Sequence, residues 1–126
     1  MAGEVILIVE DNEKNLKLAR DLLEVNGYRV LAASSAEDGV KLAREHRPDV
    51  VLMDVQLPGM DGFAALRHLR ADDATRHLVV AAFTASVMKE DVARIETAGF
   101  DAYIAKPISV REFPGMVAAL CGRKRG

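Results

Sequence analysis

The chain has 126 residues, of which half are hydrophobic and 29% are charged, a composition typical of a soluble globular protein. Its 17 Lys and Arg residues nearly balance its 19 Asp and Glu residues, and the net charge of −2 gives no sign of binding to nucleic acid or to a membrane surface. No apolar run approaches the roughly 20 residues of a transmembrane helix, and no signal peptide is visible. The single cysteine, Cys121, cannot form an internal disulfide, which favours a reduced, cytoplasmic setting.

Five short apolar runs have the character of β-strands. Those at residues 5–9, 50–53, 78–83 and 102–105 are almost continuously hydrophobic, which is typical of strands buried on both faces. The run at residues 28–32 is more mixed and suits an edge strand. Each run is followed by a stretch whose apolar residues recur with helical spacing, so strands and helices alternate five times.

Local signals place the helices between and after these strands. The first helix is expected over residues 12–26, and the second begins at Ser34 or Ser35. Ser34, and Ser109 ahead of the last helix, are each followed three residues later by Glu, which is the spacing of a capping box. Pro114 should make the last helix start late or bend. The residues expected on the inward faces of the first four helices are Leu16, Ala19, Leu22, Leu23, Ala36, Val40, Ala43, Phe63, Leu66, Leu69, Met88, Val92 and Ile95.

The alternation predicts an α/β fold with a doubly wound, five-stranded parallel sheet, right-handed crossovers and helices on both faces. With the edge strand second in sequence, the expected strand order is 2-1-3-4-5, as in flavodoxin-like (βα)5 folds. We expect residues 1–126 to form a single domain with its core over about residues 4–120. The short basic end at residues 122–126 is expected to be a solvated tail, with a weak contact to an anion or partner left open.

Polar side chains stand at the ends of four predicted strands. These are Glu10 and Asp11 after the first strand, Asp54 after the third, Thr84 after the fourth and Lys106 after the fifth. Ligands of open parallel sheets bind outside the carboxyl ends of the strands, where the strand order reverses, so these groups should share one edge. Three carboxylates that close are unfavourable unless some are protonated or a cation neutralises them. Oxygen ligands without His or Cys favour a hard ion such as Mg²⁺.

This set of groups suits phosphoryl transfer to a carboxylate. A Mg²⁺ ion lets a dianionic phosphoryl group approach an anionic nucleophile, Lys106 offers a cation to a second phosphoryl oxygen, and the Thr84 hydroxyl can bond a third. An aspartate can then form an aspartyl-phosphate. Position alone leaves open which carboxylate is the nucleophile.

Four segments together carry a resemblance to a known family. Residues 7–12 (LIVEDN), 52–62 (LMDVQLPGMDG), 83–85 (FTA) and 103–107 (YIAKP) resemble the receiver domain of bacterial two-component response regulators, and the resemblance extends from about residue 4 to residue 120. Residues 53–58 and 88–91 are similar in particular to the DivK type of single-domain regulator. Glu10 departs from the pattern, since many relatives have Asp there, and its longer side chain should change water-mediated metal geometry more than function.

The resemblance implies an acceptor and a metal site. Asp54 would accept a phosphoryl group from a phosphohistidine on a sensor histidine kinase or a histidine phosphotransfer protein. Mg²⁺ would be held by Asp11, Asp54 and the backbone carbonyl of Gln56, with Glu10 assisting through a water molecule. The resemblance therefore implies that Asp54 is the nucleophile, a choice that the residue pattern alone left open.

The resemblance also implies how the site responds. Lys106 would contact the phosphoryl group and precede Pro107 through a cis peptide bond, which X-Pro permits at small energetic cost. Thr84 and Tyr103 would form a switch pair, with the hydroxyl moving toward the phosphoryl group and the ring turning inward.

A phosphorylation-controlled signalling module, and not an enzyme, is the leading hypothesis from these observations. Its output is expected through protein contacts of the face formed by residues 88–98, 102–105 and the last helix, with no nucleic-acid partner and no membrane insertion. A monomer is the expected state. The alternative within the same chemistry is a phosphorelay intermediate that passes the phosphoryl group on.

Two other classes fit the strand ends less well. An aspartate-nucleophile phosphohydrolase usually has two carboxylates spaced by one residue after the first strand, whereas Glu10 and Asp11 are adjacent. A flavodoxin-like flavin protein needs a hydroxyl- and glycine-rich phosphate loop at that position, and acidic residues there repel a phosphate. The three histidines, His46, His68 and His77, lack metal-ligand spacing and are expected at the surface.

Overall fold

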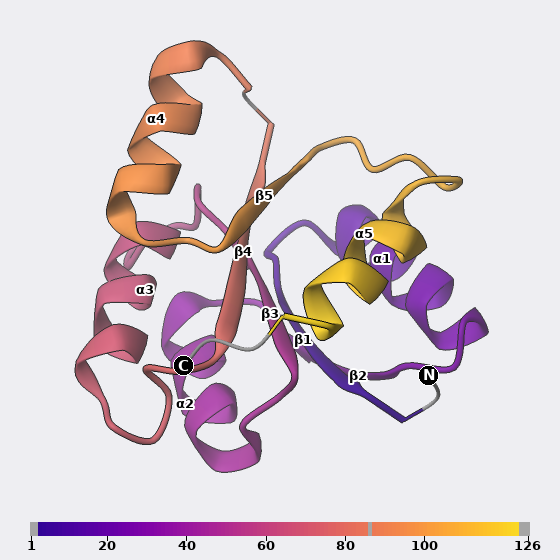
Figure 1. Ribbon diagram of the computed structural model, residues 1–126, viewed down its shortest axis with the longest axis horizontal. Helices are drawn as coiled ribbons and strands as arrows, with labels where there is room; N and C mark the ends of the chain where they lie inside the picture. The colour runs from indigo at the N-terminus through magenta and orange to yellow at the C-terminus, as the bar shows by residue number, and fades with distance from the viewer. Residues whose placement is uncertain (1–2, 86, 124–126) are drawn as a thin grey trace.

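A computed structural model of the protein describes residues 3–85 and 87–123 (Figure 1). Its strands are β1 (Val5–Val9), β2 (Arg29–Ala33), β3 (Val50–Asp54), β4 (Val79–Thr84) and β5 (Ala102–Ala105). Its helices are α1 (Glu13–Val25), α2 (Ala36–His46), α3 (Gly62–Ala71), α4 (Lys89–Ala98) and α5 (Phe113–Cys121). All strand pairs are parallel and the sheet order is β2-β1-β3-β4-β5, which confirms the predicted fold.

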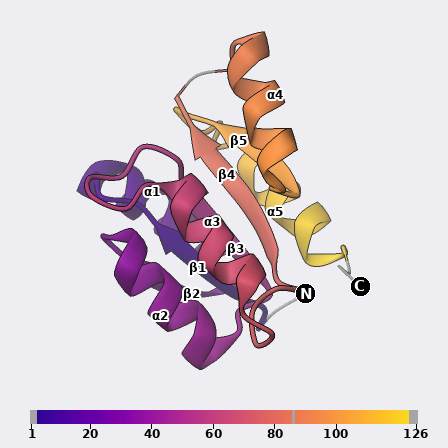
Figure 2. The same cartoon turned by 90° about the vertical axis from the view of Figure 1, so that its left-hand side faces the viewer.

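The sheet separates two hydrophobic layers because successive residues of a strand point to opposite faces. In β1, Leu7 and Val9 pack toward α2, α3 and α4, whereas Ile6 and Ile8 pack toward α1 and α5. Figure 1 shows α1 and α5 together on one side of the sheet, and Figure 2 shows α2, α3 and α4 side by side on the other. This double burial explains why the central strands are hydrophobic throughout.

Side chains cap the N-termini of α1 and α2, with one shift from the expected positions. Asn12 accepts a hydrogen bond from the backbone N–H of Asn15 and begins α1. Ser35, and not Ser34, caps α2, because the Ser35 hydroxyl accepts from the N–H of Asp38 at 3.2 Å. The Ser109 hydroxyl does accept from the N–H of Glu112 at 3.2 Å, but this bond closes a turn that precedes the helix.

The last helix begins late, as its proline predicted. α5 starts at Phe113, with Pro114 in its first turn, where the missing N–H of proline leaves no helical hydrogen bond unmade. Arg123, just after α5, donates to the backbone oxygen of Asp101 at 2.6 Å. The rest of the predicted solvated tail, residues 124–126, lies outside the described residues.

Helix α4 is packed more lightly than the periodicity predicted. Within α4, every residue of which is described, only Ile95 is buried; Val92 is half-buried, and Met88, just before the helix, is 65% exposed. The prediction of Met88 as an inward residue was therefore wrong. α3, in contrast, buries five residues.

No helix in the described parts of the chain combines the length and the hydrophobicity needed to cross a membrane.

Candidate functional site

The carboxyl ends of β1, β3, β4 and β5 bring the predicted site residues to one edge of the sheet. β1 and β3 are neighbours in register, with Val9 opposite Met53, so Glu10 and Asp54 are adjacent in space. The sequence had suggested that Asp54 and Thr84 follow their strands. In the structure they are instead the last residues of β3 and β4. Being part of the paired strands fixes the backbone of both residues.

Three carboxylates form an acidic cluster at this edge: Glu10, Asp11 and Asp54. One carboxylate oxygen from each lies within 4.8 Å of the others. Glu10 and Asp54 are almost fully buried, at 1% and 3% exposure, whereas Asp11 is exposed. Several anionic oxygens around one point match the ligands that hard divalent cations prefer, so the acidic cluster could hold a metal ion.

Lys106 connects the two buried carboxylates. Its ammonium nitrogen lies 3.0 Å from Oε1 of Glu10 and 3.2 Å from Oδ2 of Asp54, and its side chain is only 14% exposed. The cation comes from the end of β5, across β4 from the strands that carry its partners. A buried charge is tolerated when it is paired, and Lys106 provides one cation that pairs with both carboxylates.

The second oxygen of each buried carboxylate accepts a backbone hydrogen bond. The N–H of Asn12 donates to Oε2 of Glu10 at 3.1 Å, and the N–H of Gln56 donates to Oδ1 of Asp54 at 2.9 Å. In both cases the donor lies two residues after the carboxylate, which is the local pattern that Asp side chains form in turns. Sequence reasoning did not identify these two N–H groups, although the spacing is readable in the chain.

Burial and charge act together on the ionisation of this group. Burial raises the pKa of Glu10 above its ordinary value, against the opposing effect of hydrogen bonds from Lys106 and from the Asn12 N–H; the neighbouring Asp54 raises it further. Burial alone would lower the pKa of Lys106, but the hydrogen bond to Glu10 and the charges of both carboxylates more than offset it and raise that pKa. Lys106 is therefore firmly a cation at neutral pH.

The residues predicted as a switch pair lie in neighbouring strands. Thr84 is 4% exposed at the end of β4, and Tyr103 is 37% exposed in β5. The Tyr103 ring lines a hollow of 360 Å³ next to the end of α4, with Ile95 and Phe100. The ring is thus outward in this structure. The peptide bond between Lys106 and Pro107 is cis, the isomer that the resemblance implied.

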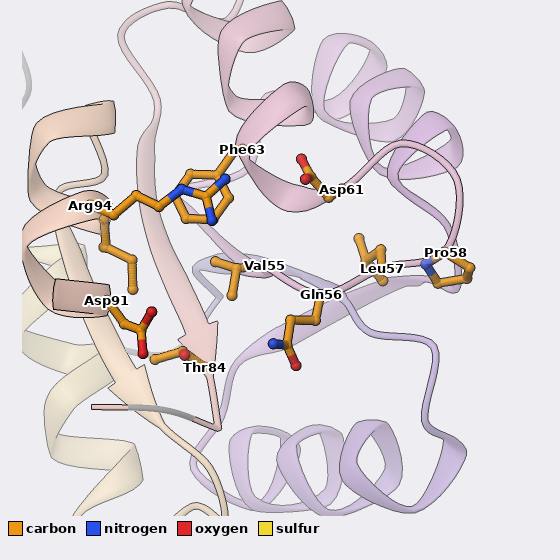
Figure 3. A pocket seen from close by; sticks show the side chains of 10 residues that line it. Val55, Gln56, Leu57, Pro58, Asp61, Phe63, Thr84, Asp91 and Arg94 are labelled. Atoms are coloured by element: carbon orange, nitrogen blue, oxygen red, sulfur yellow. The ribbon is translucent and has the colours of Figure 1, made fainter. Parts of the chain in front are cut away.

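A cleft of 510 Å³ opens beside the segment that follows Asp54 in the chain (Figure 3). Its lining residues come from the loop after β3, the end of β4 and one side of α3 and α4; they are Val55, Gln56, Leu57, Pro58, Asp61, Phe63, Thr84, Asp91, Arg94 and Ile95. Sequence reasoning missed this cleft, because its walls come from separate elements and a local sequence pattern does not predict how such elements are placed relative to one another. The three histidines are exposed, as expected for surface residues.

Comparison with known proteins places this site in a family. A family model of the response regulator receiver domain matches residues 6–118. The chain belongs to that family. The receiver domain is also 47% identical over 117 residues to the polar-differentiation response regulator DivK of Brucella anthropi, covering 93% of this chain and 95% of the relative. The corresponding protein of Brucella ovis is 46% identical over 117 residues, which again cover 93% of this chain and 95% of the relative.

Solved structures agree with this assignment. The receiver domain of a Pseudomonas aeruginosa sensor histidine kinase superimposes with a TM-score of 0.88 at 34% identity, covering 97% of this chain and all of that one. That structure has a magnesium ion coordinated in its active-site cleft. A chemotaxis response regulator of Vibrio cholerae, at 22% identity, a TM-score of 0.86 and coverage of 95% and 98%, shares the fold.

Proposed function

We propose that this receiver domain accepts a phosphoryl group on Asp54 and signals through protein contacts. The observation that carries the proposal is the arrangement of Asp54 with Lys106, 3.2 Å apart inside a cluster of carboxylates at the sheet edge. A carboxylate nucleophile with a cation held beside it is the arrangement that phosphoryl transfer to a carboxylate needs. The family matches support the same chemistry.

The transfer is a substitution at phosphorus. A carboxylate oxygen of Asp54 forms the new P–O bond, the P–N bond to a histidine of the donor protein breaks, and the imidazole nitrogen keeps the electron pair. In this proposal Lys106, which contacts Asp54, binds one phosphoryl oxygen, and the Thr84 hydroxyl at the neighbouring strand end binds another. Loss of the Lys106 contact with Asp54 on phosphorylation leaves the ammonium available for the new group.

The acidic cluster supports binding of Mg²⁺ during this step. Its oxygen donors fit a hard cation, and we assign the site to Asp11, Asp54 and the backbone carbonyl of Gln56, with Glu10 acting through water. The magnesium ion in the Pseudomonas receiver domain supports this choice of metal. When bound, Mg²⁺ neutralises charge between the carboxylates and the incoming phosphoryl group.

The response of the domain is assigned to Thr84 and Tyr103. A phosphoryl group adds about −1.5 to −2 of charge at the sheet edge. Movement of the Thr84 hydroxyl toward that group leaves space for the Tyr103 ring to turn inward, which changes the surface formed by α4, β5 and α5. The partners are then a phosphohistidine donor and a downstream protein, and the domain acts as a signalling module and not as an enzyme. The lone Cys121 favours the cytoplasm as the location.

A labelling experiment tests the acceptor. The protein is incubated with Mg²⁺ and a small phosphodonor such as acetyl phosphate, and Asp54→Ala is compared with Asp73→Ala, which removes an exposed carboxylate far from the acidic cluster. We expect one base-labile phosphoryl group on the wild type and on Asp73→Ala, and none on Asp54→Ala. A label that persists on Asp54→Ala would remove the acceptor assignment. Repeated turnover of a phosphomonoester would favour a phosphohydrolase.

A further inference from the structure

Two residues that the proposed chemistry does not use make contact inside the cleft beside Asp54. The guanidinium carbon of Arg94 lies 4.0 Å from the centre of the Phe63 ring, and Figure 3 shows the side chain of Arg94 extending from α4 across that ring. A cation over an aromatic face is attracted by the negative charge of the ring face. The contact joins the start of α3 to the middle of α4.

Phe63 is connected to Asp54 through its neighbour Gly62. A Cβ atom at Gly62 would collide with the backbone oxygen of Asp54 and would lie 2.8 Å from the Cα of Val55. The N–H of Gly62 also donates to the oxygen of Val55 at 3.4 Å. Because the two backbones are in direct contact, a shift of the Asp54 turn displaces the first residues of α3, Phe63 among them.

Phe63 also contacts the segment that follows α4. Its ring meets that of Phe100 edge-on, with centroids 5.6 Å apart and an interplanar angle of 80°. Phe100 follows the end of α4 and precedes β5. Ile95 is the only buried residue of α4, whose residues are all described, so the contact between Arg94 and Phe63 adds to a small buried surface of this helix.

We propose that Phe63 is a positioning residue that transmits the state of Asp54 to α4 by its contact with Arg94. This route is separate from the one through Thr84 and Tyr103. It rests on the proposed function only because phosphorylation of Asp54 is the event that starts it. The contact holds α4 against α3 in the structure described here. Displacement of the Asp54 turn on phosphorylation weakens the contact and shifts the balance of α4 positions.

The size of the effect follows from the kind of contact. Arg94 is exposed, and a cation–π contact at an exposed site changes a population ratio by about two- to fivefold. Such a change is too small to unfold the helix. It is large enough to alter local opening of a lightly packed helix, which amide hydrogen exchange detects.

The test compares Arg94→Gln with Arg67→Gln and Arg94→Lys. Arg67 is an exposed arginine on α3 outside the lining of the cleft, so Arg67→Gln is a matched loss of charge. Hydrogen exchange of the amides at residues 92–98 is measured with and without Mg²⁺ and acetyl phosphate, and the phosphoryl content is measured on the same samples. Phe63→Leu, which keeps a buried apolar side chain but removes the aromatic face, serves as the second variant.

In the unphosphorylated protein, we expect Arg94→Gln and Phe63→Leu to exchange about two- to fivefold faster over α4, with Arg67→Gln unchanged and Arg94→Lys close to the wild type. The change that phosphorylation produces in α4 should shrink in the first two variants. The proposal is wrong if Arg94→Gln behaves like Arg67→Gln, or if every variant loses protection across the whole chain. A wild type that takes up no phosphoryl group would refute the proposed function, whereas the unphosphorylated comparison would still decide the role of Phe63.

Discussion

The ammonium nitrogen of Lys106 lies 3.2 Å from Oδ2 of Asp54 and shields this buried carboxylate from its neighbours. The ammonium group neutralises only part of the negative charge of the site, because three carboxylates and one ammonium leave a net charge of −2 when all four are ionised. That residual charge equals the charge that one divalent cation would balance. The pair with Lys106 thus maintains the folded site, and the remaining charge makes it a site for a metal and a phosphoryl group.

Replacing Lys106 by methionine should destabilise the metal-free protein. The change keeps an unbranched side chain of four heavy atoms, one fewer than lysine, and leaves Glu10 and Asp54 buried without their shared cation. Removing one partner of a buried ion pair costs about 3 kcal/mol or more. We expect urea denaturation at pH 7 in a chelator to show a loss of that size. Lys14→Met, at an exposed position of α1, should change the free energy of unfolding by less than about 0.5 kcal/mol, and an equal effect of both changes would contradict the prediction.

Replacing Gly62 by alanine should damage both the fold and the acceptor. The added methyl group would overlap the backbone of Asp54, and overpacking of this kind costs about 1–3 kcal/mol or more. We expect a lower melting temperature and slower uptake of the phosphoryl group. Gly115→Ala is the matched control: apart from its chain neighbours and its own helix backbone, no atom of the described residues lies within 4 Å of the added carbon, so the same change in α5 should stabilise the protein by up to about 1 kcal/mol. If Gly62→Ala left the melting temperature unchanged, the turn after β3 would have to accommodate the methyl group without cost, and the prediction would be wrong.

The position of the site was predictable from sequence because one physical rule determines it. Parallel strands present all their carboxyl ends on one edge, so residues after separate hydrophobic runs must meet there. Glu10, Asp54 and Lys106 were recognised in this way, although the exact strand ends were not: Thr84 belongs to β4, since it continues the pairing with β5 opposite Ala105. Hydrophobicity marks the buried part of a strand, whereas backbone pairing extends to its polar last residue.

The placement of α4 was not predictable by the same reasoning. Helical periodicity records an apolar stripe, but it does not record whether another element covers it. Met88 belongs to that stripe and is exposed, whereas Phe63 and Arg94, from different helices, meet across the cleft. Such contacts depend on the angle between helices, which is set by packing over the whole sheet face.

The stability of the protein should fall in alkali, with Tyr28 as one cause. Burial raises the pKa of Tyr28 above its ordinary value of 10.0, and the nearby acidic groups of Cys121 and Glu4 add to the shift. Since the folded state holds this proton more tightly than the unfolded state, the contribution is fully present below pH 10 and is lost as the pH rises through the folded-state pKa. Urea denaturation of Tyr28→Phe between pH 8 and 11 should give a shallower decline. Tyr103→Phe, at an exposed ring, should follow the wild type; if the two variants decline alike, burial of Tyr28 is not the cause.

Asp11 provides the test of the metal site, because its removal should act in opposite directions with and without metal. Asp11→Asn reduces the repulsion within the acidic cluster, so the metal-free protein should be as stable as the wild type or more stable. Binding to the folded state alone stabilises the wild type by about 2.7 kcal/mol at a free Mg²⁺ concentration of 100 Kd. We expect Asp11→Asn to bind Mg²⁺ about tenfold or more weakly and so to lose about 1.4 kcal/mol of this stabilisation. Thermal denaturation across a Mg²⁺ titration measures both effects, and Glu45→Gln, at an exposed position of α2, controls for the general loss of a negative charge. If Asp11→Asn kept the full stabilisation by Mg²⁺, the ion would have to be bound without Asp11, and the ligand set assigned here would be wrong.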